Sequence, residues 1–300
     1  MKHLFVGVSV ALCITSSGAA PSATEIAMIR AAAPDRPSAA PQKPRKVLVF
    51  SKFYGFNHTA VPYGTVAFEV IGSKTDAYTP IVSDDDAMFE PDNLSQFDAV
   101  VFNNTNNEIF LPEPSVYEKL SPEEKAKADA RDARLKASLV DYLKRGGGLA
   151  VLHAGVASFR QWPEYGEIIG ARFDNHPWVA GSTVTFRIEE PEHPLARAFR
   201  GREFVVQDEI YQFKEPYSRD LVRVIVSLDT TKTNMNVRGV HRTDGDFPMT
   251  WVKPYGKGRV FYCSLGHQHD IFWNPVVLRH LLDGVQFVLG DLVGPIEPRR

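Results

Sequence analysis

The stretch that decides the fold is "GGGLAVLHAGVASF", residues 146–159. Its three glycines are typical of a helix end, and the run "LAVLH" that follows is apolar up to its last residue. A short apolar run of this kind is expected for a strand buried on both faces of a parallel sheet. The run ends in His153 followed by small residues, a junction that holds a nucleophile in several α/β folds. The stretch therefore predicts a central strand that carries an imidazole at its carboxyl end.

The patterns on both sides of this strand predict alternating strands and helices. The clearest helix begins at Ser121, with Pro122 in its first turn and Glu124 completing a capping box. Leucines at 135, 139 and 143 give it a buried stripe. The other expected elements are strands at 46–51, 78–83, 98–102, 182–189 and 221–228, a hairpin at 248–266, and helices at 61–71 and from Asn274 to about 290. Strand, helix and strand in this order predict an α/β fold with a mostly parallel sheet and a β-rich second half.

The composition is that of an ordinary globular protein. The chain has 300 residues, of which 44% are hydrophobic and 23% charged. The formal net charge of −2 gives no reason to expect nucleic acid or an anionic membrane surface as a partner. One domain at 46–292 accommodates all the expected elements, and no shift in composition after residue 46 requires a second one.

The N-terminal part differs from the rest of the chain. A basic start, a short apolar run and small residues near Ala20 predict a secretory signal peptide over residues 1–23 and export to the periplasm or the medium. The apolar run is too short to span a bilayer. Residues 24–45 are rich in alanine and proline, and we expect them to form a flexible linker. Removal of the signal peptide leaves Cys263 alone, so no internal disulfide is expected.

Polar groups follow several of the expected strands. In an open parallel sheet, ligands bind beyond the carboxyl ends of the strands. The first strand leads to His58, the third to Asn103 and Asn104, the central one to His153, and the hairpin to His267. We therefore expect these residues to gather at one edge of the sheet and to form a site.

The segment "VVQDEIYQF" adds two adjacent carboxylates, Asp208 and Glu209, followed by Tyr211. Side chains of neighbouring residues point in different directions, so we expect one carboxylate to face the site. A carboxylate beside histidines can orient an imidazole, act as a general base or bind a metal ion. His153 is equally compatible with a core histidine bonded to the backbone.

The other histidines have simpler interpretations. His176 and His193 precede prolines and suit turns, and His241, His269 and His280 are expected at the surface. The sequence has no HExxH motif, no paired CxxC and no Gly-x-Ser-x-Gly.

Taken together, several segments resemble the trehalose-utilisation, or ThuA-like, family. They span roughly residues 46 to 290 and follow the family order: "VLVFSKFYGFNH", "FDAVVFNNT", "LVDYLKRGGGLAVLHAG", "EHPLARAF", "FVVQDEIYQF" and "PMTWVKPYGKGRVFYCSLGH". The resemblance implies a class I glutamine amidotransferase-like fold, which is a flavodoxin-like three-layer sandwich. In amidotransferases the strand end that corresponds to "LAVLH" supplies a catalytic cysteine. Here His153 takes that place and Cys263 lies in another strand, so we expect no glutaminase activity.

The resemblance also implies a role in sugar utilisation, including that of keto-disaccharides. The family motifs match His58, Asn104, His153, Asp208, Glu209, Tyr211, Trp251 and His267, and His176 fits a looser motif. Asn57 replaces an arginine found in many relatives, which argues against an anionic substrate.

The leading hypothesis is an exported sugar-processing enzyme in which His153 and Asp208 or Glu209 perform acid–base chemistry. His58, Asn103, Asn104, Tyr211, Trp251, His267 and His176 would bind a di- or keto-saccharide. The alternatives are a carbohydrate-binding module without catalysis and a metal-dependent hydrolase. No cofactor is evident from the sequence, and a divalent metal ion is compatible with it.

Overall fold

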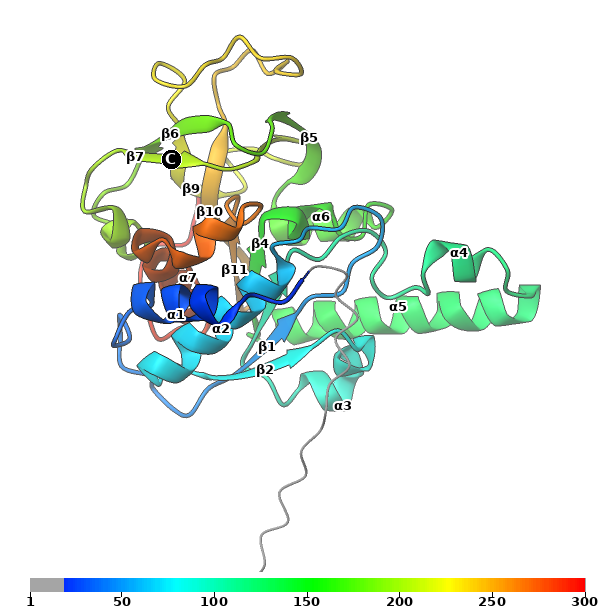
Figure 1. The fold of residues 1–300 in the computed structure, drawn as a ribbon. Helices are drawn as coiled ribbons and strands as arrows, with labels where there is room; N and C mark the ends of the chain where they lie inside the picture. The colour runs from blue at the N-terminus through cyan, green and yellow to red at the C-terminus, as the bar shows by residue number, and fades with distance from the viewer. Residues whose placement is uncertain (1–18, 300) are drawn as a thin grey trace, which may run out of the picture.

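A nine-stranded sheet organises the protein, whose computed structural model describes residues 19–299 (Figure 1). The strand order is β2-β1-β3-β4-β11-β10-β9-β6-β7, and β5 and β8 form a separate pair. The strands are β1 (Lys46–Phe50), β2 (Thr79–Ser83), β3 (Ala99–Asn103), β4 (Gly148–Leu152), β5 (Arg172–Trp178), β6 (Thr183–Ile188), β7 (Phe204–Gln207), β8 (Ile210–Lys214), β9 (Arg223–Leu228), β10 (Pro248–Tyr255) and β11 (Gly258–Cys263).

The sheet has a parallel half and an antiparallel half. Strands β2, β1, β3, β4 and β11 run parallel, with β4 in the interior of the sheet between β3 and β11. All five residues of β4 are buried, as expected for a strand covered on both faces. The hairpin β10–β11 reverses the direction, and β9, β6 and β7 continue antiparallel. The two halves therefore meet at β11, which pairs with β4.

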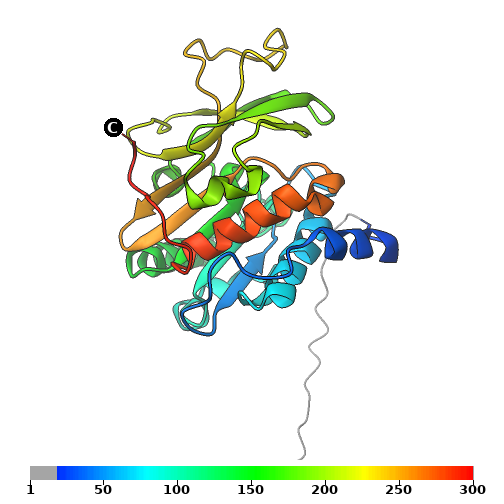
Figure 2. The ribbon, with the colours of Figure 1, turned by 90° about the vertical axis from the view of Figure 1, so that its left-hand side faces the viewer.

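Helices cover both faces of the parallel half. Helix α2 (Val61–Thr75), helix α7 (Pro275–Val288) and the N-terminal helix α1 (Ala23–Ala32) lie together on one face (Figure 2). The other face carries α3 (Pro91–Leu94), α5 (Pro122–Lys144) and α6 (Pro163–Ile169). The short helix α4 (Pro114–Tyr117) precedes α5, and the 3-10 helices are η1 (Asp86–Phe89), η2 (His153–Ala157), η3 (Pro194–Phe199) and η4 (His269–Trp273).

The sequence predicted this architecture well. The three-layer α/β fold with a mostly parallel core is confirmed, as are the capping box of Ser121 and Glu124 and the buried leucines of α5. Strands β5, β7 and β8 were not expected. Their sequences do not alternate cleanly between apolar and polar residues.

The structure differs from the expected linker at 24–45. Ala23–Ala32 form helix α1, which has a capping box of Ser22 and Glu25 and buries Ile29 completely. The backbone N–H of Ser38 then donates to Gln286 Oε1 at 2.7 Å, which ties the segment to α7. The linker prediction was wrong because alanine is the best helix former and tertiary contacts hold the proline-rich part. Most of the predicted signal peptide, residues 1–18, lies outside the described residues.

Two further findings concern single residues and the membrane. His280 was expected at the surface, but it is buried on α7, where its Nδ1 lies 2.8 Å from Leu195 O. Its Nε2 lies 3.2 Å from the Thr250 hydroxyl of β10, so both ring nitrogens have partners in the buried position. Cys263 is buried in β11 and forms no disulfide within residues 19–299. From residue 19 to 299, no helix has the length and apolarity needed to cross a bilayer.

Candidate active site

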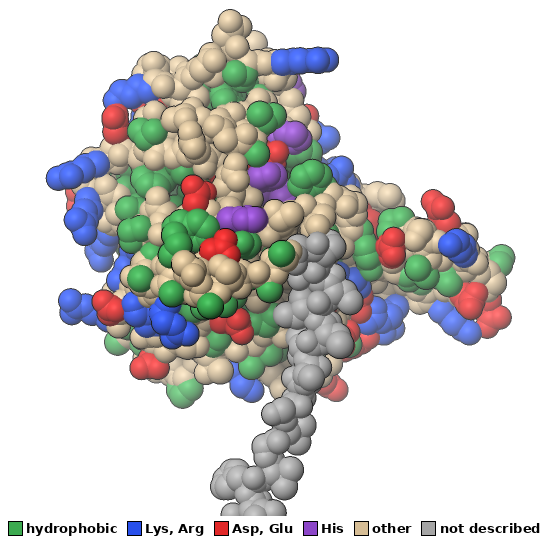
Figure 3. Space-filling view, viewed as in Figure 1, with side chains coloured by type: hydrophobic (Ala, Val, Ile, Leu, Met, Phe, Trp, Pro, Cys, Tyr) green, Lys and Arg blue, Asp and Glu red, His purple; other side chains and the backbone are tan. Residues whose placement is uncertain are grey.

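Three histidines from different strand ends meet at the carboxyl edge of the parallel half. His58 follows β1, His153 follows β4 and His267 follows β11. Their ring centroids lie 5.3 to 5.4 Å apart. Glu209, in the turn between β7 and β8, joins them, and one ligand atom from each of the four lies within 4.8 Å of the others. Figure 3 shows histidine side chains (purple) close together on the face of the molecule viewed in Figure 1.

His153 is fixed in orientation by its neighbours. Its φ of 44° lies in the left-handed region, which is uncommon for a residue other than glycine and turns the chain sharply from β4 into η2. Its Nδ1 lies 2.7 Å from the carbonyl oxygen of Ser264. Because a carbonyl only accepts, Nδ1 carries a proton and donates it. This anchoring directs Nε2 toward the Tyr211 hydroxyl at 2.8 Å and Glu209 Oε2 at 3.4 Å.

The surroundings of His153 bear on both interpretations from the sequence. The ring is completely buried and bonded to the backbone, as a core histidine would be. Its second nitrogen nevertheless faces a carboxylate and a tyrosine hydroxyl. A buried imidazole with one nitrogen anchored and the other directed at a polar cluster is suited to a functional role.

Glu209 is the carboxylate that faces the imidazoles. Its Oε2 lies 3.2 Å from His267 Nδ1, and its Oε1 lies 3.3 Å from Nδ1 of His176 at the end of β5. Burial alone raises the pKa of Glu209, but His153 and His267 more than offset this and hold it well below its ordinary value. Glu209 is therefore ionised at neutral pH.

The two other cluster histidines respond to the same surroundings in opposite directions. Burial and the neighbouring imidazoles lower the pKa of His58 to about 3, so this ring is neutral. Burial also lowers the pKa of His267, but the Glu209 carboxylate reverses the effect and raises it. The cluster thus combines a carboxylate with rings of different proton affinity.

Asp208, the other member of the adjacent pair, points to the backbone. It is completely buried and accepts hydrogen bonds from the N–H groups of Gly266 at 2.8 Å, His267 at 3.2 Å and Gln268 at 2.9 Å. Burial raises its pKa, and His153 and the backbone donors oppose that rise. Asp208 thereby holds the turn that presents His267, which makes it a positioning residue.

A cavity of about 190 Å³ opens beside the cluster. Phe56 and Phe173 give it apolar walls, and Arg160 and His176 add polar groups. The remaining lining residues are His58, Asn106, Ala154, Ala157, Glu209 and Tyr211. Sequence reasoning missed Phe56, Asn106, Arg160 and Phe173. Phe56 lies in the segment "VLVFSKFYGFNH" already singled out and Asn106 directly follows "FDAVVFNNT", whereas no local pattern marks Arg160 or Phe173.

Three of the predicted binding residues have structural partners instead of lining the cavity. Asn103 is buried and donates to Ser51 Oγ and Val61 O, both at 3.0 Å. Asn104 donates to Gly266 O at 3.0 Å and accepts from the N–H of Ala154. The indole of Trp251 is buried, stacks on Tyr262 and donates to Ile169 O at 2.8 Å. Asn104 thus supports the loops of His153 and His267, while Trp251 belongs to the core.

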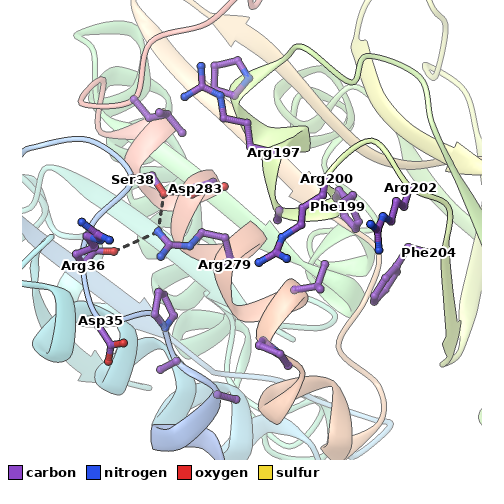
Figure 4. Close-up of a pocket in the computed structure, with 18 of the residues that line it drawn as sticks. Asp35, Arg36, Ser38, Arg197, Phe199, Arg200, Arg202, Phe204, Arg279 and Asp283 are labelled. Atoms are coloured by element: carbon purple, nitrogen blue, oxygen red, sulfur yellow. Dashed lines mark hydrogen bonds between the residues drawn. The ribbon is translucent and has the colours of Figure 1, made fainter.

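A larger hollow, of about 960 Å³, lies between η3, α7 and residues 31–38 (Figure 4). Its lining includes Arg36, Arg197, Arg200, Arg202 and Arg279. Among the residues that the structure describes, none of these arginines forms a salt bridge. No imidazole lines this hollow. Its carboxylates Asp35, Glu203 and Asp283 already have partners in Lys74, Lys232 and Ser38. The histidine cluster and its smaller cavity therefore form the candidate site.

Comparisons with known proteins agree with this architecture. No curated protein matches the chain. Among solved structures, a putative ThuA-like protein of Bacteroides uniformis is 19% identical with a TM-score of 0.63, and the match covers 83% of this chain and 93% of that one. A putative ThuA-like protein of Parabacteroides merdae is 16% identical with a TM-score of 0.52, covering 82% and 90%. At these identities the likeness shows the fold alone. The family model for trehalose utilisation, ThuA, matches residues 46–288, and the chain therefore belongs to the ThuA family.

Proposed function

We propose that the protein is a carbohydrate-processing enzyme that acts on a disaccharide or its keto form by acid–base chemistry. The single observation that carries this proposal is the position of Glu209. Its carboxylate lies within 3.4 Å of imidazole nitrogens of His153, His176 and His267, and it lines the cavity. A carboxylate among imidazoles, next to a space for substrate, places groups that can accept and donate protons within reach of a bound molecule.

The cavity walls suit a sugar. Phe56 and Phe173 offer flat apolar faces against which the C–H face of a pyranose can pack. Asn106, Arg160 and His176 offer hydrogen bonds for hydroxyl and carbonyl groups. Phe56 and Phe173 would take the sugar-binding role expected of Trp251. The modest volume favours one sugar unit in the cavity and the other at its mouth.

The proton path follows from the two oxygens of Glu209. Oε1 faces His176, which lines the cavity, and Oε2 faces the buried His153 and the partly buried His267. Glu209 would accept a proton from a sugar hydroxyl or from the carbon next to a keto group. His176 would return a proton to the leaving or rearranged group. The N-terminal signal pattern supports placing this activity outside the cytoplasm.

The proposal is tested by assaying the purified protein against disaccharides and their keto forms, with products separated by chromatography. We expect Glu209→Gln to lower kcat by about 100-fold or more, because the amide cannot accept the proton. Glu203→Gln, which changes an exposed carboxylate paired with Lys232, should leave turnover unchanged. Full turnover by Glu209→Gln would refute the proposal. Calorimetric binding of the sugar with no turnover by the unmodified protein would indicate a carbohydrate-binding module.

A further inference from the structure

We infer that His58, His153, His267 and Glu209 form a binding site for a divalent transition-metal ion, with zinc as the best fit. The ion would assist the reaction proposed above, and in that respect its role rests on that proposal. Its binding, however, can be measured independently of any activity. The donor set is three imidazole nitrogens and one carboxylate oxygen, which is typical of zinc and related ions and unlike the all-oxygen sets of calcium or magnesium.

The distances between the donor atoms fit such an ion. Zinc bonds of 2.0 to 2.1 Å in a tetrahedron place neighbouring ligand atoms about 3.4 Å apart. Glu209 Oε2 lies 3.4 Å from His153 Nε2 and 3.2 Å from His267 Nδ1. All four donor atoms fall within 4.8 Å of one another, so small side-chain rotations bring them to coordination distance.

Two of the imidazoles each have a buried nitrogen without a partner. Nδ1 of His58 and Nδ1 of His267 are buried and make no hydrogen bond with any described residue. The 3.2 Å approach of Glu209 Oε2 to His267 Nδ1 is an ion-pair contact that lacks hydrogen-bond geometry. Buried polar atoms without a partner are rare and call for an explanation, such as an ion at the site. One ion would satisfy both nitrogens.

The surrounding residues orient the ligands as metal sites require. His153 donates Nδ1–H to Ser264 O, which leaves Nε2 free to bind the ion. Asp208 holds the backbone of His267 through three N–H groups. Tyr211 contacts His153 Nε2 at 2.8 Å, and its hydroxyl would move aside when that nitrogen binds the ion.

The position of the site would allow the ion to contact a substrate. Glu209 and His58 also line the cavity, so a substrate oxygen can approach the ion from that side. With four protein donors in place, the ion would take the substrate oxygen as a fifth ligand, an expansion that zinc permits, and would polarise a carbonyl or hydroxyl group. The keto group or a hydroxyl of the proposed sugar is a ligand of this kind.

The test measures metal binding directly on the purified protein. After removal of metal with a chelator, zinc is titrated by calorimetry and cobalt by its visible absorption. We expect one ion per chain, cobalt bands typical of low coordination number, and a higher Tm with zinc. His58→Ala and His267→Ala should each weaken binding by 10-fold or more. His241→Ala, which changes an exposed histidine paired with Asp174, should bind as the unmodified protein does.

Several results would overturn the inference. One such result is that the protein binds less than one ion per chain at saturating zinc. Another is that both His58→Ala and His267→Ala bind zinc with unchanged affinity. Circular dichroism of each variant shows whether the fold is retained. The smaller change His267→Asn is a second variant for separating loss of a ligand from loss of the fold. Turnover of sugar by metal-stripped protein that binds no zinc would reject the metal site and leave the proposed function standing. Stoichiometric zinc binding without turnover of any sugar would reject the function and leave the site standing.

Discussion

At the scale of single residues, the carboxylates of Asp208 and Glu209 have different roles although the two residues are adjacent in the chain. Asp208 is enclosed by backbone N–H groups, and Glu209 by imidazoles. The side chains diverge because they leave the backbone in different directions between β7 and β8. Asp208 stabilises the loop that carries His267, and Glu209 faces the cavity.

The role of Asp208 leads to a prediction about stability. In Asp208→Asn the amide nitrogen cannot accept from the N–H groups of Gly266, His267 and Gln268, and the charge that strengthens these bonds is lost. We expect the free energy of unfolding to fall by about 1 to 3 kcal/mol, measured by urea denaturation. Asp270→Asn, at an exposed position close by, should change it by less than about 0.5 kcal/mol. Equal stability of the two variants would contradict the positioning role.

At the scale of elements, helix α5 shows which signals are readable locally. Ser121 and Glu124 satisfy free N–H groups at its start, and Pro122 suits its first turn. Its first half carries charged residues and its second half buries Leu135, Leu139 and Leu143 against the sheet. The helix therefore forms where its sequence predicts, and its C-terminal half contributes most of its packing.

Truncation of the buried stripe tests this division. Leu139→Ala removes a fully buried side chain from the core between α5 and the sheet. We expect a loss of about 2 to 5 kcal/mol in the free energy of unfolding, because the cavity closes only in part. The control is Leu221→Ala, because Leu221 is 38% exposed. The loss of unfolding free energy in this variant should stay well below about 2 kcal/mol. Thermal or urea denaturation of both variants gives the comparison.

At the scale of the whole molecule, the N-terminal segment and α7 are joined far from the candidate site. Asp283 of α7 accepts a hydrogen bond from Ser38, and Arg279 donates to Ser38 Oγ at 2.8 Å. Burial raises the pKa of Asp283 to about 7, although Ser38, Arg279 and Arg197 oppose the rise. Asp283 therefore binds a proton in the folded protein at pH values where the unfolded chain has released it.

This difference predicts a dependence of stability on pH. The raised pKa means that the stability contributed by protonated Asp283 is present near pH 4 and is lost as the pH rises toward 7. The slope from this one group is at most about 1.4 kcal/mol per pH unit. Asp283→Asn should flatten the curve of unfolding free energy between pH 4 and 7, whereas Asp220→Asn, at an exposed position, should not. Identical slopes in Asp283→Asn and the unmodified protein would show that Asp283 does not titrate in this range.

The sequence by itself determined the parallel core and part of the site. Apolar runs, caps and glycine stops are local, so β1, β3, β4, α5 and α7 could be predicted from them. His58, His153 and His267 could be expected at one edge because parallel strands end on the same side of a sheet. Only the tertiary structure decided which carboxylate faces them, that Trp251 packs in the core, and that Phe56, Phe173 and Arg160 line the cavity. Those outcomes depend on how β5, β8 and the antiparallel strands pack against the parallel half. Such long-range packing produces no periodic pattern in the sequence.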